Sequence, residues 1–504
     1  MSDRRARALL ALAFFFVGVA AGWRQDPKTR PFTFDNQIYF YMAERAAAGV
    51  APHVSLVDHK HQLSTILSGL AIRAGRKLGI HDVIAVRAMS IAVAGLTVAA
   101  VTWLAAELTG SLATAALAGL AMLAFPGYFT QAAMGVRPKV FMATFMSLAL
   151  VAFARRRPAA SGFLAACSFL CWQPALLVSV GLAAATLVSA RERARSLARL
   201  VAGAVFAVAF YEAYFLWHGA LGEQIRQSYL LPASASGYRY PALGESLAFV
   251  VRMGIGWRLD SSRVLPILLL VLLAVLPVVA LTRPRRAFVF LRERPAWCAA
   301  GCVAYPAVAF TLLTHEGYPD MFFIEPFIAL AAAVAITFTA RALARRTHRL
   351  AYYGLIAACA VWLAFLQDSR ATAFKNEGTR LEDQYELAKQ LDVLFDAYGS
   401  VWAVGCPHLL ALLGRENFSP YGLLIDRKVQ AYMRRGSESA GGPFEDGRLP
   451  GAILSARGGL RTVLPSLPRQ YERIENLSFT RAGIQVWVQR LPRVGGLPRP
   501  AARR

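Results

Sequence analysis

A short acidic and aromatic segment near the N-terminus carries the residue types best suited to chemistry. Residues 31–41 read PFTFDNQIYFY and place Asp35 among five aromatic side chains. A carboxylate held beside apolar groups loses hydration and its pKa tends to rise, which suits a general base or a metal ligand. Asp35 can instead cap a helix that starts at Asn36, a common role for aspartate. Asp35 is therefore a candidate catalytic base, and Tyr39 beside it is a candidate substrate-binding residue.

A second polar group follows further along the chain. Asp58, His59, Lys60 and His61 are consecutive and precede an amphipathic stretch at residues 64–78. Asp58 and the two histidines are candidate metal ligands, although alternating ligands on a loop are a weak metal pattern. Lys60 and the histidines suit phosphate binding comparably well. A solvated loop is the third interpretation, and the residue types alone leave all three open.

Further candidate binding residues lie in later polar segments. They are Arg137 and Lys139 in residues 131–139, Gln173 in a short turn, Arg252 and Arg258 in residues 218–263, and Glu316 and Asp320 in residues 315–325. The basic side chains suit a phosphate group. The alternative for the two acidic residues is loop solvation, with Asp320 capping a helix that begins at Met321.

The composition indicates that membrane-spanning helices hold these residues. The chain has 504 residues, of which 56% are hydrophobic, and its mean hydropathy is +0.43, which is too apolar for a soluble protein of this size. Its uncharged runs approach the length that crosses a hydrocarbon core of ~30 Å. Eleven runs are expected, at residues 9–22, 84–108, 112–130, 140–154, 159–171, 174–190, 197–217, 264–281, 296–314, 322–340 and 351–367.

The arginines between these runs predict the orientation of the helices. The formal charge is +25, but the basic clusters lie between apolar runs, for example at residues 155–157, 191–199 and 283–294. Cytoplasmic loops are rich in Arg and Lys, so the pattern predicts a multi-pass protein of the inner or plasma membrane with a cytoplasmic N-terminus, and it argues against nucleic acid as a partner. The long outer segments are then residues 23–83, 218–263 and everything from 368 onward, and the short outer loops include residues 131–139 and 315–325.

Two alternatives to this topology stay open. The first apolar run is short and follows several arginines, so it also resembles a cleaved signal peptide. The runs at 159–171 and 174–190 are separated by only a few residues and can form a single kinked helix. A single helix there would invert the orientation of every later segment.

The hydrophilic tail is long enough to bury a core of its own. Helices are expected at residues 377–398 and 408–413, and strands at 401–404, 452–455 and 484–488. The expected fold is an all-α polytopic membrane protein of about eleven transmembrane helices over residues 1–367, followed by a small extracytoplasmic α/β domain over residues 368–490. Residues 491–504, rich in Pro, Gly and Arg, are expected to be disordered.

Several short motifs, in order along the chain, resemble the GT-C superfamily of membrane glycosyltransferases, which includes protein mannosyltransferases and the lipid A aminoarabinose transferase. Residues 34–39, FDNQIY, are similar to the acidic motif of its first outer loop, and residues 58–63, DHKHQL, to its His-Lys-Pro-Pro-Leu turn with the prolines replaced. Gly79, Arg87, the turn at residues 172–174 and the segment 317–326 match further parts of the layout.

The resemblance implies an enzyme that moves a sugar from a polyprenyl-phosphate donor to a glycan, lipid or protein acceptor at the outer membrane face. Asp35 would activate the acceptor hydroxyl for inverting attack, while cations neutralise the leaving phosphate. The candidate cations are Lys60, Arg137, Lys139, Arg252 and Arg258.

The chain also departs from the superfamily pattern. Residues 131–139 contain no acidic residue where many relatives have one, and Asn36 stands where protein mannosyltransferases have Glu. A two-carboxylate metal site is therefore not expected and no cofactor is assigned, although a divalent metal is not ruled out.

Other functions remain open at this stage. A transporter or flippase for lipid-linked sugars would bury polar groups at mid-membrane, whereas the polar groups here collect in the outer segments. An O-antigen ligase or polymerase would apply related chemistry to another acceptor. A non-enzymatic assembly protein would not need Asp35.

Overall fold

The computed structural model describes residues 3–33, 35–189, 192–231, 282, 284–314, 318–344, 353–354, 356–361, 380–422, 449–456, 470–474 and 482–490. The expected span at 264–281, most of the one at 351–367 and the tail at 491–504 lie outside these residues.

Apolar helices form a bundle that accounts for most of the described chain. They are α1 (Asp3–Trp23), α5 (Asp82–Thr109), α6 (Leu112–Leu123), α7 (Pro126–Ala133), α8 (Pro138–Ala154), α9 (Pro158–Cys171), α10 (Leu176–Ser189), α11 (Arg193–Trp217), α17 (Pro295–Thr314) and α18 (Glu325–Ala344). The 3₁₀ turn η1 (Gln173–Ala175) precedes α10, the helix α16 (Pro284–Glu293) precedes α17, and the 3₁₀ helix η4 (Tyr318–Phe323) precedes α18.

The lengths of these helices confirm only part of the expected topology. Within the described ranges, α1, α5, α11, α17 and α18 are long and apolar enough to cross a membrane, and α6 with α7 makes a sixth candidate if that pair, bent by 64°, acts as one span. The bend divides the run expected at 112–130, because the residue before a proline is disfavoured in a helix and α7 begins at Pro126. The helices α8, α9 and α10 are shorter than a full span, so the number of eleven stays a prediction.

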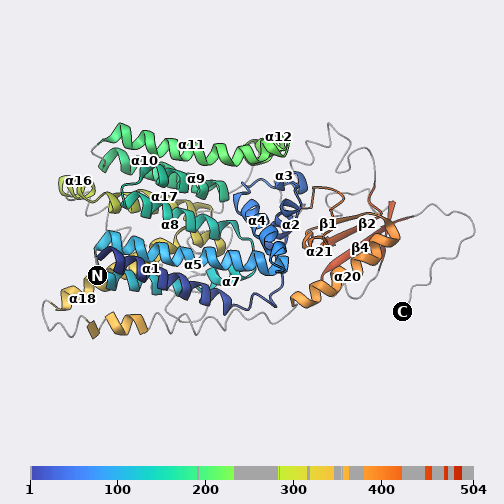
Figure 1. Ribbon diagram of the computed structural model, residues 1–504, viewed down its shortest axis with the longest axis horizontal. Coiled ribbons are helices and arrows are strands. Elements are labelled where there is room, and N and C mark those ends of the chain that lie inside the picture. The colour runs from blue at the N-terminus through green and yellow to red at the C-terminus, as the bar shows by residue number, and fades with distance from the viewer. Residues whose placement is uncertain are drawn as a thin grey trace, which may run out of the picture.

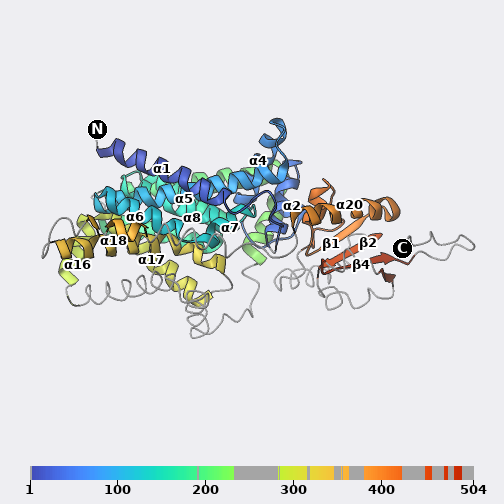
Figure 2. The same cartoon turned by 90° about the horizontal axis from the view of Figure 1, so that it is seen from below.

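The bundle helices run roughly along the long axis of the molecule (Figure 1). α1 lies on one side of the bundle and α16, α17 and α18 on the opposite side, with α5 and α8 between them (Figure 2). Small residues allow close contact between α1 and α5. A Cβ atom on Gly95 would lie 2.8 Å from the carbonyl oxygen of Phe15, so this crossing requires glycine.

The segment that the sequence predicts to lie outside, residues 23–83, is called the first outer segment after that prediction, and it contains short helices at one end of the bundle (Figure 1). These are α2 (Asp35–Ala47), α3 (Pro52–Ser55) and α4 (Leu63–Lys77). After α11, the helix α12 (Leu221–Ile225) and the π-helix η2 (Arg226–Leu230) lie against them.

The C-terminal region, by which we mean the described residues from 380 to 490, combines helices with a sheet. Its elements are α20 (Leu381–Tyr398), β1 (Val401–Val404), α21 (His408–Leu412), β2 (Ala452–Ala456), β3 (Tyr471–Ile474) and β4 (Ile484–Gln489). The strand order is β1-β2-β4-β3, with β1 parallel to β2 and the other pairs antiparallel. The two helices and the three strands expected here are confirmed to within a few residues, and β3 was not expected.

The C-terminal region and the first outer segment share one hydrophobic core. Phe32 and Phe40 belong to the same buried cluster as Leu387, Leu391 and Ala403. The two parts are more than three hundred residues apart in the sequence, and periodicity within each gave no sign that they pack together. Packing against the C-terminal region therefore fixes the position of the segment that contains Asp35.

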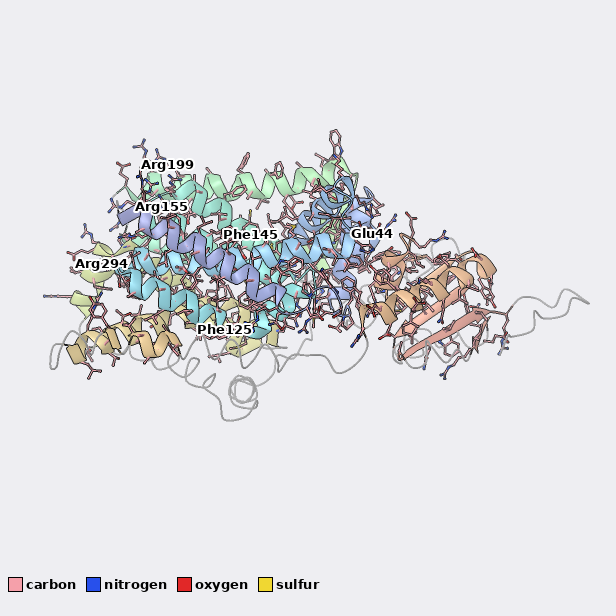
Figure 3. The ribbon with its side chains drawn as sticks, turned by 60° about the horizontal axis from the view of Figure 1, so that its bottom comes forward. Glu44, Phe125, Phe145, Arg155, Arg199 and Arg294 are labelled. Carbon is pink, nitrogen blue, oxygen red and sulfur yellow. The ribbon has the colours of Figure 1, made fainter. Side chains whose placement is uncertain are left out.

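Three arginines mark the end of the bundle that is remote from the C-terminal region (Figure 3). Arg155, Arg199 and Arg294 lie at the end remote from the C-terminal region, whereas Glu44 of α2 lies near that region (Figure 3). The helices therefore carry these arginines on the opposite side from the candidate site described below.

Candidate active site

Asp35 lies where two polar segments meet that are distant in the sequence. It is the first residue of α2, and its Oδ2 lies 3.0 Å from Nη1 of Arg137 and 3.9 Å from Nζ of Lys60. Arg137 directly precedes α8, and Lys60 lies in the turn between α3 and α4. The Asp35 side chain is 43% exposed, whereas those of Arg137 and Lys60 are 11% and 23% exposed. The carboxylate is therefore accessible while its cationic partners are largely covered.

The pKa of Asp35 is lowered well below its ordinary value. Partial loss of hydration among the surrounding residues acts to raise this pKa, but the positive charges of Arg137, Lys60 and Lys139 outweigh that effect. The raised pKa expected from the aromatic surroundings is wrong, because these cations come from segments that the local sequence does not place beside Asp35. The carboxylate is therefore ionised at neutral pH.

Tyr39 holds Lys60 beside Asp35. The Lys60 ammonium donates a hydrogen bond of 2.9 Å to the Tyr39 hydroxyl, and it lies 5.5 Å from the centre of the Tyr39 ring. Because Tyr39 follows Asp35 by four residues on α2, the two side chains share one helix face. Burial lowers the pKa of Lys60, but Tyr39, Asp35 and Asp58 together raise it well above its ordinary value, so the ammonium is charged.

A second carboxylate, that of Asp320, pairs with Lys139, which follows Arg137 by two residues. The Lys139 ammonium forms an ion pair with Asp320 of η4, and it lies 4.7 Å from the centre of the Trp172 ring. The alternative that Asp320 caps a helix beginning at Met321 is wrong, since residues 318–323 form one 3₁₀ helix. Arg137 therefore pairs with Asp35 of α2, and Lys139 pairs with Asp320 of η4.

The turn between α3 and α4 is buried, which contradicts the solvated-loop interpretation. Asp58 is 1% exposed, and its carboxylate accepts a hydrogen bond of 2.7 Å from the Gln62 amide. Its backbone N–H donates to the side-chain oxygen of Gln227 at 3.2 Å. The Gln173 amide donates to the carbonyl oxygen of His59 at 2.6 Å. Polar side chains from three parts of the chain thus replace water around this turn.

His61 does not join the cluster around Asp35. Its ring is buried, with centroid distances of 4.7 Å to Phe169, 4.9 Å to Tyr229 and 5.8 Å to Tyr211. Burial lowers the pKa of His61 to about 3, so the imidazole is neutral. His61 therefore lies in an aromatic pocket and is not placed to bind phosphate.

The metal interpretation of Asp58, His59 and His61 finds no geometric support. His59 lies near Asp58, with 3.6 Å between Nδ1 and Oδ1, but His61 is elsewhere. Within the described part of the chain, no three His, Cys, Asp or Glu side chains converge in a way that could hold a metal ion. That the protein works without a metal stays a prediction.

A π-helix, η2, supports the turn that carries Lys60, and no pattern in the sequence predicted it. Gln227 Oε1 lies 3.2 Å from Nδ1 of His53, and Ser228 Oγ lies 3.1 Å from Nε2 of the same ring. Ser228 Oγ also lies 3.4 Å from the Lys60 carbonyl oxygen. Burial lowers the pKa of His53 to about 4, so one ring nitrogen donates and the other accepts. π-Helices are rare and are found frequently at functional sites.

Gln384 of α20 is another residue that the sequence reasoning missed. Its side chain hydrogen-bonds the backbone of Phe32, close to Asp35. One signal was present, because Gln384 is a polar residue on the helix face formed by Leu381, Ala388 and Leu391. Arg252, Arg258 and Glu316 lie outside the described residues.

Comparison with known proteins gives one family and several structures. The sequence model of the DolP-mannose mannosyltransferase family matches residues 53–211, which include the Lys60 turn, Arg137 and Lys139. No curated protein matches the chain.

ArnT from Cupriavidus metallidurans aligns over 94% of this chain and 97% of its own in the apo state, with 14% identity and a TM-score of 0.62. The same protein bound to undecaprenyl phosphate aligns over 95% and 97%, with 14% identity and a TM-score of 0.58. The Archaeoglobus fulgidus oligosaccharyltransferase, in a complex with Zn and sulfate, aligns over 94% of this chain and 73% of its own, with 13% identity and a TM-score of 0.52. These likenesses show a shared fold.

Proposed function

We propose that this chain, which has the GT-C fold of membrane glycosyltransferases, transfers a sugar from a polyprenyl-phosphate donor to an acceptor at the outer face of the membrane. The observation that carries the proposal is the accessible Asp35 carboxylate with Arg137 and Lys60 beside it. One site thus holds a proton acceptor and the cations that a phosphate leaving group needs. The undecaprenyl phosphate bound to ArnT and the DolP-mannose family support this class of donor.

The proposed reaction is a single displacement at the anomeric carbon. The acceptor oxygen attacks this carbon while its proton passes to the Asp35 carboxylate. The bond from the anomeric carbon to the phosphate oxygen breaks, and its electron pair leaves with the lipid phosphate. The configuration is therefore inverted. Arg137 and Lys60 stabilise the negative charge that develops on the departing phosphate.

The donor phosphate competes with Asp35 for the same cations. In the structure described here Arg137 and Lys60 are paired with Asp35. Once phosphate occupies these cations, they lower the pKa of Asp35 less, and the phosphate charge itself raises that pKa. Asp35 therefore becomes a stronger base when the donor is bound.

The distribution of charge supports an outer location for the site. Arg155, Arg199 and Arg294 lie at the opposite end of the bundle (Figure 3). Because arginines mark the cytoplasmic side of a membrane protein, Asp35 and the C-terminal region are proposed to face outward.

The proposal is tested by replacing Asp35 with asparagine and measuring transfer from a polyprenyl-phosphate sugar in the purified protein. Loss of a general base is expected to lower kcat by about 10²- to 10⁴-fold. Asp82→Asn is the matched control, because Asp82 is also the first residue of a helix, the bundle helix α5, and also pairs with an arginine, Arg76 at 2.7 Å. Full activity of Asp35→Asn would contradict the base assignment.

A flippase and an O-antigen ligase or polymerase are separated from this function by their products. Mass spectrometry of envelope glycans and glycolipids, with and without the gene, is the discriminating measurement. Loss of a single sugar from a finished glycan supports transfer. Accumulation of an unflipped lipid intermediate supports transport, and loss of a whole polymer supports a ligase or polymerase.

A further inference from the structure

We propose that Gln384 is a positioning residue for Asp35, which makes the C-terminal region a working part of the active site. The proposal rests on the function proposed above. Its starting point is a pair of hydrogen bonds between parts of the chain that are 352 residues apart.

The Gln384 side chain forms hydrogen bonds with both backbone groups of Phe32, the N–H and the carbonyl. Its Oε1 accepts a hydrogen bond from the Phe32 N–H at 2.8 Å, and its Nε2 donates to the Phe32 carbonyl at 2.8 Å. Gln384 is 7% exposed and Phe32 is fully buried. A buried pair of this kind is costly to break, because no water replaces the lost partner. The contact therefore fixes the position and the orientation of the Phe32 peptide groups.

Neighbouring contacts restrain the same stretch further. The backbone N–H of Leu381 donates to the Thr29 carbonyl at 2.8 Å, so the start of α20 holds the segment at two points. The Phe32 ring stacks on Phe40 with a centroid distance of 4.3 Å, and the Arg87 guanidinium lies 4.6 Å from its centre. Phe32 is thus held by its backbone from the C-terminal region and by its ring from α2 and α5.

A short path connects Phe32 to Asp35. Asp35 follows Phe32 by three residues and opens α2. The first turn of α2 is tied back to this segment, since Gln37 Nε2 donates to the Phe32 carbonyl at 3.1 Å and Asn36 N–H donates to the Thr33 carbonyl at 3.1 Å. A shift of Phe32 therefore moves the start of α2 and changes the distances from Asp35 to its cations.

The C-terminal region also contacts the first outer segment away from Asp35, which provides a matched control. The backbone N–H of Asn417 donates to the Tyr41 hydroxyl at 2.9 Å, and Val57 N–H donates to the Pro420 carbonyl at 2.9 Å. Tyr41→Phe removes one buried hydrogen bond between the same two parts, further along α2 from Asp35. Gln384→Met keeps the length and volume of the side chain and removes both of its hydrogen bonds.

The test compares these two variants in the full-length protein with a polyprenyl-phosphate sugar donor. We expect Gln384→Met to lower kcat by about 10- to 100-fold, the loss that a misplaced catalytic group causes, with the donor KM within about twofold of wild type. Tyr41→Phe is expected to keep kcat while lowering the thermal midpoint by less than Gln384→Met does, because it removes one buried hydrogen bond instead of two. Gln384→Glu, which keeps the acceptor for the Phe32 N–H, is expected to lose less activity than Gln384→Met.

A second readout follows from the charges on Asp35. If Gln384→Met moves Asp35 away from Arg137, the pKa of Asp35 rises and the acid limb of kcat/KM shifts to higher pH. A purely structural role of Gln384 would leave this limb in place. Wild-type kcat and an unshifted pH profile in Gln384→Met would overturn the positioning role.

The outcomes also separate this inference from the proposed function. An Asp35→Asn variant measured in parallel must lose transfer if Asp35 is the base. If Asp35→Asn is inactive and Gln384→Met is fully active, only the positioning role fails. If Asp35→Asn is fully active, the base assignment fails and the positioning role fails with it.

Discussion

Arg137 and Asp35 form an ion pair of 3.0 Å between the residue before α8 and the first residue of α2. In the free protein, the candidate base and a candidate phosphate ligand are thus each other's partners. In the proposed mechanism, donor binding separates Asp35 from Arg137, so the pH dependence of the reaction is expected to depend on this ion pair.

Replacing Arg137 with glutamine is expected to move the acid limb of kcat/KM to higher pH. The pKa of Asp35 is lowered against the effect of burial, and among the charges Arg137 has the largest effect, so its loss raises that pKa. Wild type is expected to show no acid limb from Asp35 between about pH 5 and pH 8, because the carboxylate is ionised throughout. Arg137→Lys keeps the charge and serves as the control. A profile that is the same in all three proteins would contradict the electrostatic account.

Replacing Lys60 is expected to lower kcat/KM for the donor more than replacing Tyr39. Lys60→Met removes a proposed charged partner of the donor phosphate, and we expect kcat/KM for the donor to fall by about 10- to 100-fold. Tyr39→Phe removes only the neutral group that holds Lys60 in place, so the loss is expected to stay below about tenfold. Steady-state kinetics at varied donor concentration measure both. Equal losses would show that Tyr39 itself contacts the substrate.

The ion pair between Lys139 and Asp320 is expected to contribute strongly to the free energy of unfolding, with non-additive effects of replacing the two residues. Their side chains are 16% and 6% exposed, so Asp320→Asn leaves a covered ammonium without its partner and should cost about 3–5 kcal/mol. Adding Lys139→Met is expected to recover part of this loss. Thermal unfolding of the single and double variants in detergent measures the coupling.

The exposed pair of Lys389 and Glu386 is the control for that coupling. These side chains are 69% and 67% exposed, so Glu386→Gln is expected to change stability by less than about 1 kcal/mol. If Asp320→Asn is equally mild, the Lys139 pair is not an important contact.

His61 is expected to be replaceable for activity but to matter for acid stability. Because the pKa of His61 is about 3 and that of His53 about 4, the folded protein binds fewer protons than the unfolded chain below about pH 6.5. Stability is fully present above that pH and falls as the pH drops towards the two lowered values. His61→Phe is expected to keep transfer activity and to weaken this dependence. Loss of transfer in His61→Phe would instead give the ring a role in catalysis.

Chelation of divalent ions is expected to leave transfer unchanged. Among the described residues, the carboxylates of Asp35 and Asp320 already pair with the basic side chains of Arg137 and Lys139. Activity measured before and after treatment with EDTA tests this. A loss that added Mg²⁺ or Mn²⁺ restores would show that a metal takes part.

Features that depend on local sequence were accessible from the residue pattern. The runs that form α1, α5, α11 and α17 are recognisable because a helix satisfies its own backbone hydrogen bonds within a continuous apolar stretch. The strands β1, β2 and β4 follow from short apolar segments bounded by turns. Asp35, Lys60, Arg137 and Lys139 stood out because they lie in polar segments between such runs and have the side chains that suit a general base and phosphate ligands.

The contact partners of the site residues, and the pKa values that follow from them, depended on contacts between distant segments of the chain. The pKa of Asp35 falls because Arg137, about one hundred residues later, packs against it, and no local pattern encodes that approach. His61 looked like a ligand beside Lys60, yet its ring turns into an aromatic pocket lined by Phe169 and Tyr211. Gln384 shows the same limit. Its amide acquires a structural role only when folding places the backbone of Phe32 against it, because a hydrogen bond requires its two groups to be about 3 Å apart.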